Sequence, residues 1–142
     1  MIKYTTKRLD DLSLNTINKL MELSFGEGGG MHDQISKYKM YRENKDKKSK
    51  HWTAIFAKDD STFIGWSLIK KSYHDSHAMY YVNNSHRRMG VGTQLFNRSR
   101  NYLLKTKKSE YISVFPHDFK SSKFFRILAE KHEDVHLDVW SS

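Results

Sequence analysis

The sequence predicts an α/β domain, in which short strands and amphipathic helices follow one another along the chain. Three segments lead to this prediction. Residues 77–82 have the aromatic and β-branched composition of a strand, and a glycine-containing turn joins them to a helical pattern that begins at Val91. Residues 53–57 and 62–69 form an expected hairpin. Residues 111–115 form another expected strand, which a second helical pattern follows.

The N-terminal part of the chain is expected to hold one strand and two helices. Residues 1–9 predict the first strand, and apolar residues at helical spacing over 16–25 predict a helix that begins near Asn15. Residues 31–44 predict a second, more polar helix. The glycine-rich segment 26–30 does not follow a strand and carries a glutamate where an anion would bind. We therefore interpret it as a mobile joint and not as a phosphate loop.

The expected hairpin has a tight acidic turn, residues 58–61, and a glycine, Gly65, inside its second strand. Further along the chain, Pro116 ends the strand 111–115, because proline lacks the N–H group that a β-ladder needs. Asp118 is a suitable N-cap for the helix that follows. The expected inner face of that helix consists of Ser121, Phe124, Phe125 and Leu128.

Residues 87–92 (RRMGVG) join the strand 77–82 to the helix that begins at Val91. In this arrangement the N–H groups of the first helical turn and the positive end of the helix dipole point to one place. Gly90 and Gly92 lack a Cβ, so an anion can approach the main chain closely. The helix has an expected buried face (Val91, Leu95, Phe96, Ser99, Tyr102 and Leu103) and an expected polar face (Gln94, Asn97 and Asn101). The sequence therefore predicts a phosphate-binding turn.

The pattern Arg87-x-x-Gly90-x-Gly92 resembles the pyrophosphate loop of the GNAT superfamily of acetyl-CoA-dependent N-acetyltransferases, whose motif is Arg/Gln-x-x-Gly-x-Gly/Ala. Two other phosphate loops fit less well. A P-loop has a lysine where this chain has Thr93, and the dinucleotide fingerprint has a third glycine. The hairpin before the turn, and the strand and helix after it, stand in the family's order. The resemblance therefore covers roughly residues 50–128.

The resemblance implies a GNAT fold, with a mixed central sheet that is splayed between its fourth and fifth strands and flanked by helices. It implies that acetyl-CoA, the acetyl donor, binds in this opening, while an unidentified primary amine accepts the acetyl group directly. The segment between the first two helices would border the amine site. The N–H groups of residues 88–93 would hold the pyrophosphate, and the backbone of Val82 would pair with the pantetheine arm. The cofactor-binding residues implied are Tyr81, Val82, Arg87, Arg88, Met89, Gly90, Val91, Gly92, Thr93, Ser121 and Phe125.

Both standard catalytic positions of the family hold residues that cannot move a proton. The general base falls near Ala78, and the tyrosine that serves the thiolate falls at Phe125. Tyr80 shares the strand face of Ala78 and is a candidate donor. His77 is a candidate base, since histidine exchanges protons near neutral pH, but it points to the other face unless the strand contains a bulge. His74 and His117 border the expected cleft. Many family members need only a chain of waters as the base, so activity is still expected.

Length and composition agree with one folded domain over residues 1–142. Apolar residues make up 37% of the chain and aromatic residues 13%, which excludes a disordered protein. No run approaches the ~18 apolar residues of a membrane span, and the N-terminus lacks the apolar core of a signal peptide. We therefore expect a cytoplasmic monomer or homodimer with no membrane partner. The chain has no cysteine, which excludes disulfides, thiolate catalysis and cysteine-bound zinc.

One motif suggests a metal site that we do not expect. Residues 132–136 match the zinc-protease pattern H-E-x-x-H, which requires both histidines on one helix face. Here Val135, Leu137 and Val139 alternate with polar or aromatic residues, which is the spacing of a strand. No good third ligand follows His136, so no metal is predicted.

The net charge of +9 favours an anionic partner. Lysines are densest in residues 45–50 and 105–108, which we interpret first as solvated loops. Part of the excess charge would attract coenzyme A. Binding to nucleic acid is a less favoured alternative, because the aromatic residues do not alternate with the basic runs as a base-stacking surface needs. The other function class is therefore a catalytically weak or inactive GNAT-fold protein that binds nucleic acid or a protein through its basic surface.

Overall fold

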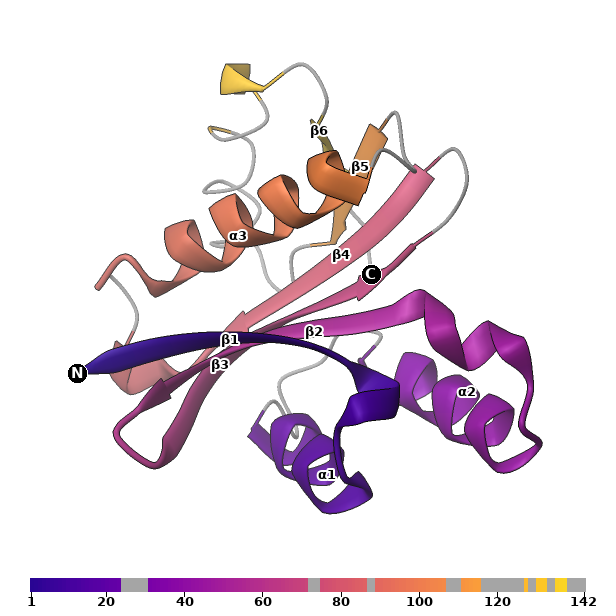
Figure 1. Cartoon of the computed structure of the whole chain (residues 1–142). Coiled ribbons are helices and arrows are strands. Elements are labelled where there is room, and N and C mark those ends of the chain that lie inside the picture. Colours follow the sequence, from indigo (N-terminus) through magenta and orange to yellow (C-terminus); the bar gives the residue numbers. More distant parts are fainter. Residues whose placement is uncertain are drawn as a thin grey trace.

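The computed structural model describes residues 1–23, 31–71, 75–86, 89–106, 111–115, 127, 130–132 and 135–137. Within these residues, six strands form one sheet in the order β1-β2-β3-β4-β5-β6 (Figure 1). The strands are β1 (Ile2–Arg8), β2 (Trp52–Asp59), β3 (Thr62–Lys70), β4 (Asp75–Val82), β5 (Tyr111–Phe115) and β6 (Val135–Leu137). The helices are α1 (Leu14–Leu23), α2 (Met31–Glu43) and α3 (Val91–Thr106), and the 3-10 turns are η1 (Leu9–Asp11), η2 (Lys47–His51) and η3 (Asn84–His86).

The sheet is mixed. Strands β1 to β4 pair antiparallel, whereas β5 pairs parallel with both β4 and β6. The ladder between β3 and β4 is regular from His77 to Val82, while the ladder between β4 and β5 runs only from Asp75 to Met79. The C-terminal end of β4 therefore extends past its ladder with β5. This mixed sheet with its flanking helices confirms the predicted fold class.

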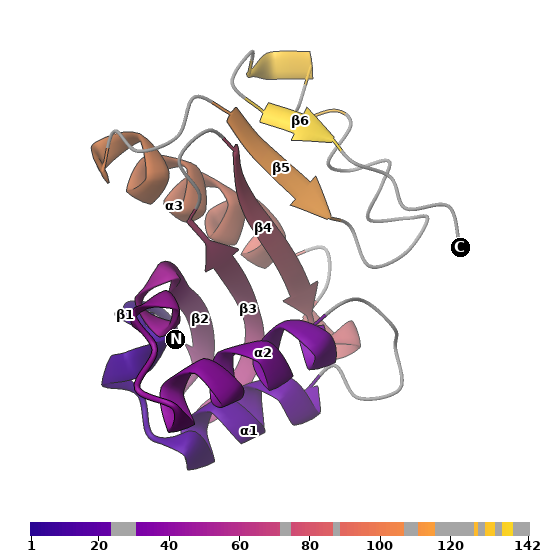
Figure 2. The same ribbon diagram turned by 90° about the vertical axis from the view of Figure 1, so that its right-hand side faces the viewer.

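Helices cover both faces of the sheet: α1 and α2 lie on one face and α3 lies on the other (Figure 1), while β5 and β6 continue the sheet beyond β4 (Figure 2). Each face has its own core. The α3 core consists of Ile55, Ala57, Ile64, Ile69, Ala78, Tyr80, Val91, Leu95, Phe96 and Leu103. The α1/α2 core consists of Leu9, Leu12, Ile17, Leu20, Ile35, Tyr38, Trp52, Ala54, Phe56, Trp66, Leu68 and Tyr81.

Helix α1 begins at Leu14, next to its predicted start near Asn15. The Oγ atom of Ser13 accepts a hydrogen bond from the N–H group of Thr16 at 3.1 Å, and the carbonyl oxygen of Ser13 accepts from Ile17. Ser13 is therefore the N-cap, because its side chain satisfies an N–H group that the helix leaves open. The predicted start near Asn15 is therefore confirmed to within one residue.

Helix α3 has the two predicted faces. Its apolar positions are buried or half-buried, and Gln94, Asn97 and Asn101 are exposed. The expected loop 45–50 differs, because it contains η2, which Asp46 caps by accepting a hydrogen bond from the N–H group of Lys48. Ser49 within this turn is buried and donates to Asp10 at 3.2 Å, so part of the basic run packs against the fold. None of the helices in the described residues is long and apolar enough to cross a membrane.

Candidate active site

The first turn of α3 has the geometry of an anion-binding turn. Gly90 has a φ angle of +80°, in the left-handed region that glycine adopts without strain, and its carbonyl oxygen accepts from the N–H group of Gln94 at 3.0 Å. The helix ladder therefore starts at Gly90, and it does not use the N–H groups of residues 91–93. Gly90 and Met89 are exposed, so an anion can approach this turn from solvent.

This turn packs beside the C-terminal end of β4, and Gly65 on β3 is where the two meet. A Cβ atom placed on Gly65 would lie 3.4 Å from the Cγ1 atom of Val91 on α3 and 2.9 Å from the carbonyl oxygen of Tyr81 on β4. The turn predicted to hold a pyrophosphate is therefore a neighbour of the strand end, Tyr81 and Val82, that is predicted to hold a pantetheine arm.

Tyr80 points into the α3 core. Its side chain is 3% exposed, and its ring lies 6.4 Å from the ring of Phe96. Burial raises the pKa of its hydroxyl to about 12, although hydrogen bonding with Ser99 and Ser67 acts in the opposite direction. The Oγ atom of Ser99 also donates to Ser67 at 2.8 Å, so three hydroxyl groups gather beneath α3.

His77 lies on the opposite face of β4 from Tyr80. The ladder with β3 is regular between the two residues, so no bulge turns His77 toward Tyr80. Strand alternation places His77 with Met79 and Tyr81, which pack in the core beneath α1 and α2. The ring of Tyr81 stacks on that of Trp66 at 6.0 Å. The two candidate catalytic residues therefore face opposite sides of the sheet.

The structure thus brings together the predicted site residues of two segments, namely Tyr81 and Val82 at the end of β4, and Met89, Gly90, Val91, Gly92 and Thr93 at the start of α3. Four other predicted cofactor residues lie outside the described residues: Arg87, Arg88, Ser121 and Phe125. The same holds for the candidate histidines His74 and His117 and for the glycine-rich segment 26–30.

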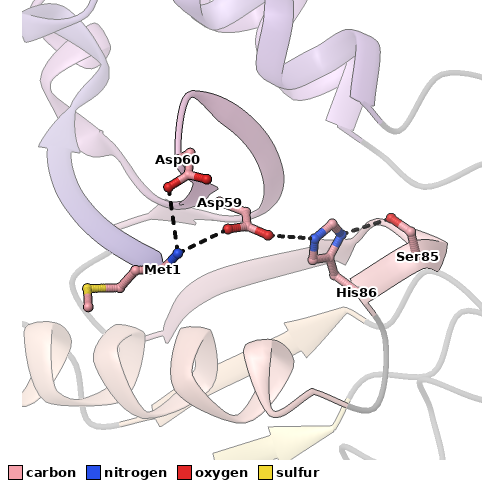
Figure 3. A network of polar contacts seen from close by, with 5 residues as sticks. All are labelled: Met1, Asp59, Asp60, Ser85 and His86. Atoms are coloured by element: carbon pink, nitrogen blue, oxygen red, sulfur yellow. Dashed lines mark hydrogen bonds and ion pairs between the residues drawn. The ribbon is translucent and has the colours of Figure 1, made fainter.

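Sequence reasoning missed a polar network next to the anion-binding turn (Figure 3). The Nε2 atom of His86 lies 3.2 Å from Oδ2 of Asp59, and its Nδ1 atom lies 2.8 Å from Oγ of Ser85. The other carboxylate oxygen of Asp59 accepts from the α-amino group of Met1 at 3.4 Å. These hydrogen bonds lower the pKa of the Asp59 carboxyl, and the one with His86 has the largest effect. The acidic turn in the sequence was the only signal of this network.

The two histidines of the H-E-x-x-H pattern do not share a helix. His132 lies outside the regular elements with its ring 5.7 Å from that of Phe96, and His136 lies in β6, which confirms the predicted strand spacing. In the part of the chain that the structure describes, no group of three histidine, aspartate or glutamate side chains could hold a metal ion.

Several lysine side chains lie over aromatic rings. The ammonium groups of Lys48, Lys70 and Lys71 lie 5.4, 5.0 and 4.3 Å from the ring centres of Tyr41, Trp52 and Tyr102, respectively. Such contacts are attractive because the ring face is electronegative. Lysines near these rings therefore have a structural role on the protein's own surface.

Comparison with known proteins identifies the family. Residues 14–129 match the model of the acetyltransferase (GNAT) family. A search of curated protein sequences finds no match.

Solved structures show the same fold. An aminoglycoside acetyltransferase from an uncultured soil metagenomic sample is 14% identical, with a TM-score of 0.62, and the match covers 99% of this chain and 95% of that one. A ribosomal-protein-alanine N-acetyltransferase from Brucella melitensis biovar Abortus is 14% identical, with a TM-score of 0.56 and coverage of 100% and 96%. A GNAT-family acetyltransferase from Streptococcus pneumoniae is 16% identical, with a TM-score of 0.61 and coverage of 100% and 98%.

Proposed function

The chain belongs to the acetyltransferase (GNAT) family, and we propose that it moves an acetyl group from acetyl-CoA directly to a primary amine. The observation that supports this proposal most is the position of the first turn of α3 beside the end of β4. Gly65, Val91 and the carbonyl group of Tyr81 meet there, so the predicted anion site and a strand end lie next to each other. A donor with a pyrophosphate at one end and an amide-containing arm at the other requires both.

In this proposal, different residues bind the different parts of the donor. The N–H groups of the turn, from Met89 to Thr93, would hold the pyrophosphate, together with Arg87 and Arg88. The backbone of Tyr81 and Val82 would pair with the pantetheine amides. Ser121 and Phe125 would form the opposite wall, as the family resemblance implies. The donor supplies an activated acetyl group, and the protein binds and orients it.

His77 and Tyr80, on opposite faces of β4, are alternative candidates for the proton transfer. The attacking amine must be neutral, so its proton has to leave as the C–N bond forms and the C–S bond breaks. We place His77 as the acceptor of that proton, because it shares the face of α1 and α2, the helices on either side of the segment that borders the amine site in the family. Tyr80 is the remaining candidate to protonate the thiolate. Its hydroxyl is buried with Ser67 and Ser99 on the α3 side, the face opposite to His77, so the two residues are alternatives for one reacting centre and not partners at it.

The proposal covers primary amines as a class and does not name one acceptor. Two of the structural neighbours are named for different acceptors, an aminoglycoside and a ribosomal-protein alanine. A panel of small amines, lysine peptides and peptides with a free N-terminal alanine would therefore be assayed for acetyl-CoA-dependent release of coenzyme A thiol. The cytoplasmic location also stays a prediction from the sequence.

Variants separate the catalytic roles. His77→Gln is expected to lower kcat about 10²-fold or more if His77 is the base, and Tyr80→Phe to do the same if Tyr80 is the donor. A silent Tyr80→Phe would leave protonation of the thiolate to water. If the wild-type protein binds coenzyme A but acetylates no amine of the panel, the protein is instead a GNAT-fold binding protein.

A further inference from the structure

The network around Asp59 connects two parts of the fold that are distant in sequence (Figure 3). Asp59 is the last residue of β2, at the tip of the β2–β3 hairpin, and His86 is the last residue of η3. Their side chains meet at 3.2 Å, although 27 positions separate them. The hairpin tip is therefore tied to the chain segment that leads from β4 into the anion-binding turn.

The hydrogen bonds of His86 fix its ring. In the neutral ring, Nε2–H donates to Asp59, and Nδ1 accepts from the hydroxyl group of Ser85. Its backbone is held too, because the N–H group of His86 donates to the carbonyl oxygen of Asn83 at 2.9 Å. His86 is only 20% exposed, while the side chain of Asp59 is 37% exposed. The segment that follows β4 is thus anchored at His86, through both the side chain and the backbone of this residue.

The anchored segment leads directly into the anion-binding turn. Asn83, at its start, donates its N–H group to the carbonyl oxygen of Ile64 on β3 at 2.7 Å. Met89 and Gly90, at its other end, are exposed, and the helix ladder begins only at Gly90. Asp59, on the β2–β3 hairpin, is a side chain from outside η3 that contacts it.

We propose that Asp59 and His86 form a positioning pair for the cofactor-binding turn, which holds the turn in the geometry that receives the pyrophosphate of coenzyme A. This proposal rests on the proposed function. In this proposal the pair acts without contacting the donor: Asp59 holds His86, which lies three positions before Met89 in the turn. The effect is expected in donor binding, since a partly exposed hydrogen-bonded pair of this kind contributes little to global stability.

Coenzyme A affinity, measured by calorimetry, tests the pair directly. Asp59→Ala and His86→Asn, which lacks a donor at the position of Nε2, are each expected to raise the Kd about 3- to 5-fold, the upper part of the range of a partly exposed pair. The double variant should be no weaker than either single variant, because both changes remove the same interaction. Asp11→Ala is the control, because it removes another surface pair, with Arg8 at 3.5 Å, on a different part of the fold.

The two variants must act alike for the proposal to hold. Asp59 also contacts the α-amino group of Met1, so a loss seen only in Asp59→Ala would assign the effect to that contact and overturn the pairing with His86. Unchanged affinity in both variants would overturn it as well. If His86→Asn fails to fold, His86→Ala with Asp59→Ala completes the same comparison.

Kinetics with two acetyl donors distinguishes positioning from a general structural effect. In both variants KM for acetyl-CoA should rise by the same 3- to 5-fold while kcat is unchanged. With acetyl-pantetheine, which lacks the pyrophosphate, kcat/KM should equal that of the wild type. Equal losses with both donors would overturn the proposal. If the wild-type protein itself neither binds coenzyme A nor uses acetyl-CoA, the proposed function fails first and the positioning role with it.

Discussion

Gly65 and the carbonyl oxygen of Tyr81 are packed so closely that no side chain fits between them. A Cβ atom on Gly65 would lie 2.9 Å from that oxygen, and 3.4 Å from side-chain atoms of both Val91 and Leu95. The oxygen belongs to the backbone of β4 and cannot rotate away. The absence of a side chain at position 65 is therefore what allows the start of α3 to pack against β3 and β4.

Gly65→Ala is accordingly expected to destabilise the protein by about 1–3 kcal/mol, the usual cost of overpacking. For a domain of this size the melting temperature would fall by roughly 3–10 °C. Gly90→Ala is a useful contrast: no heavy atom lies within 4 Å of its added Cβ, so only the positive φ angle opposes it, at about 1 kcal/mol. Thermal melts of both variants measure the difference. A Gly65→Ala protein as stable as the wild type would show that β4 can move.

Ligand-induced stabilisation tests the cofactor assignment. A ligand at 100 times its Kd adds about 2.7 kcal/mol to the free energy of unfolding, which should raise the melting temperature by roughly 5–10 °C here. Acetyl-CoA and coenzyme A should both have this effect, whereas NAD and ATP should have little. Equal shifts with ATP, or none with coenzyme A, would contradict the assignment.

Gly92→Val tests whether the main chain of the turn approaches an anion. Gly92 is in the first turn of α3, and valine is a better helix former than glycine, so apo stability should not fall. Affinity for coenzyme A should drop about tenfold or more, equivalent to ~1.4 kcal/mol, because a branched side chain would occupy the pyrophosphate position. Asn97→Val, on the exposed face of the same helix, is the control and should bind normally. Calorimetry giving equal affinities would mean that the turn has no role in binding.

Alkaline unfolding reports on the buried hydroxyl of Tyr80. Its pKa is about 12 in the folded protein and 10.0 in the reference state, so between these values the folded protein keeps a proton that the unfolded chain loses. This stabilisation is complete below pH 10 and is lost as pH rises toward 12, by about 3 kcal/mol. Tyr80→Phe removes the titrating group, so its free energy of unfolding should fall less over this range. Urea unfolding at pH 9, 10 and 11 compares the two proteins, and parallel curves would refute the prediction.

Periodic patterns in the sequence predicted the elements whose burial is regular. In α3, Leu95, Phe96 and Leu103 share one face, and that face is buried. The strands β2 and β3 were found from their composition and from the tight turn between them. These predictions succeeded because alternation and helical spacing record directly which side of an element faces the core.

Elements fixed by single hydrogen bonds were not predictable in the same way. The first residue of α1 depends on the Ser13 side chain, and η2 depends on the cap from Asp46. Strand β4 begins at Asp75 and not at His77, because pairing of Asp75 with Tyr111 on β5 extends it. Each of these contacts involves a single partner and leaves no periodic pattern in the sequence.

The sequence by itself predicted the fold class, and the resemblance of its Arg87-x-x-Gly90-x-Gly92 motif predicted the family. It also predicts an anion-binding turn, because glycines at a strand-to-helix junction have a local physical meaning. Tertiary structure alone decided that the ladder of β4 with β3 has no bulge between His77 and Tyr80, and that Asp59 reaches His86. The physical reason is that side-chain contacts between distant segments depend on strand register and on the way the hairpin packs. Both are set by the whole sheet and not by neighbours in the chain.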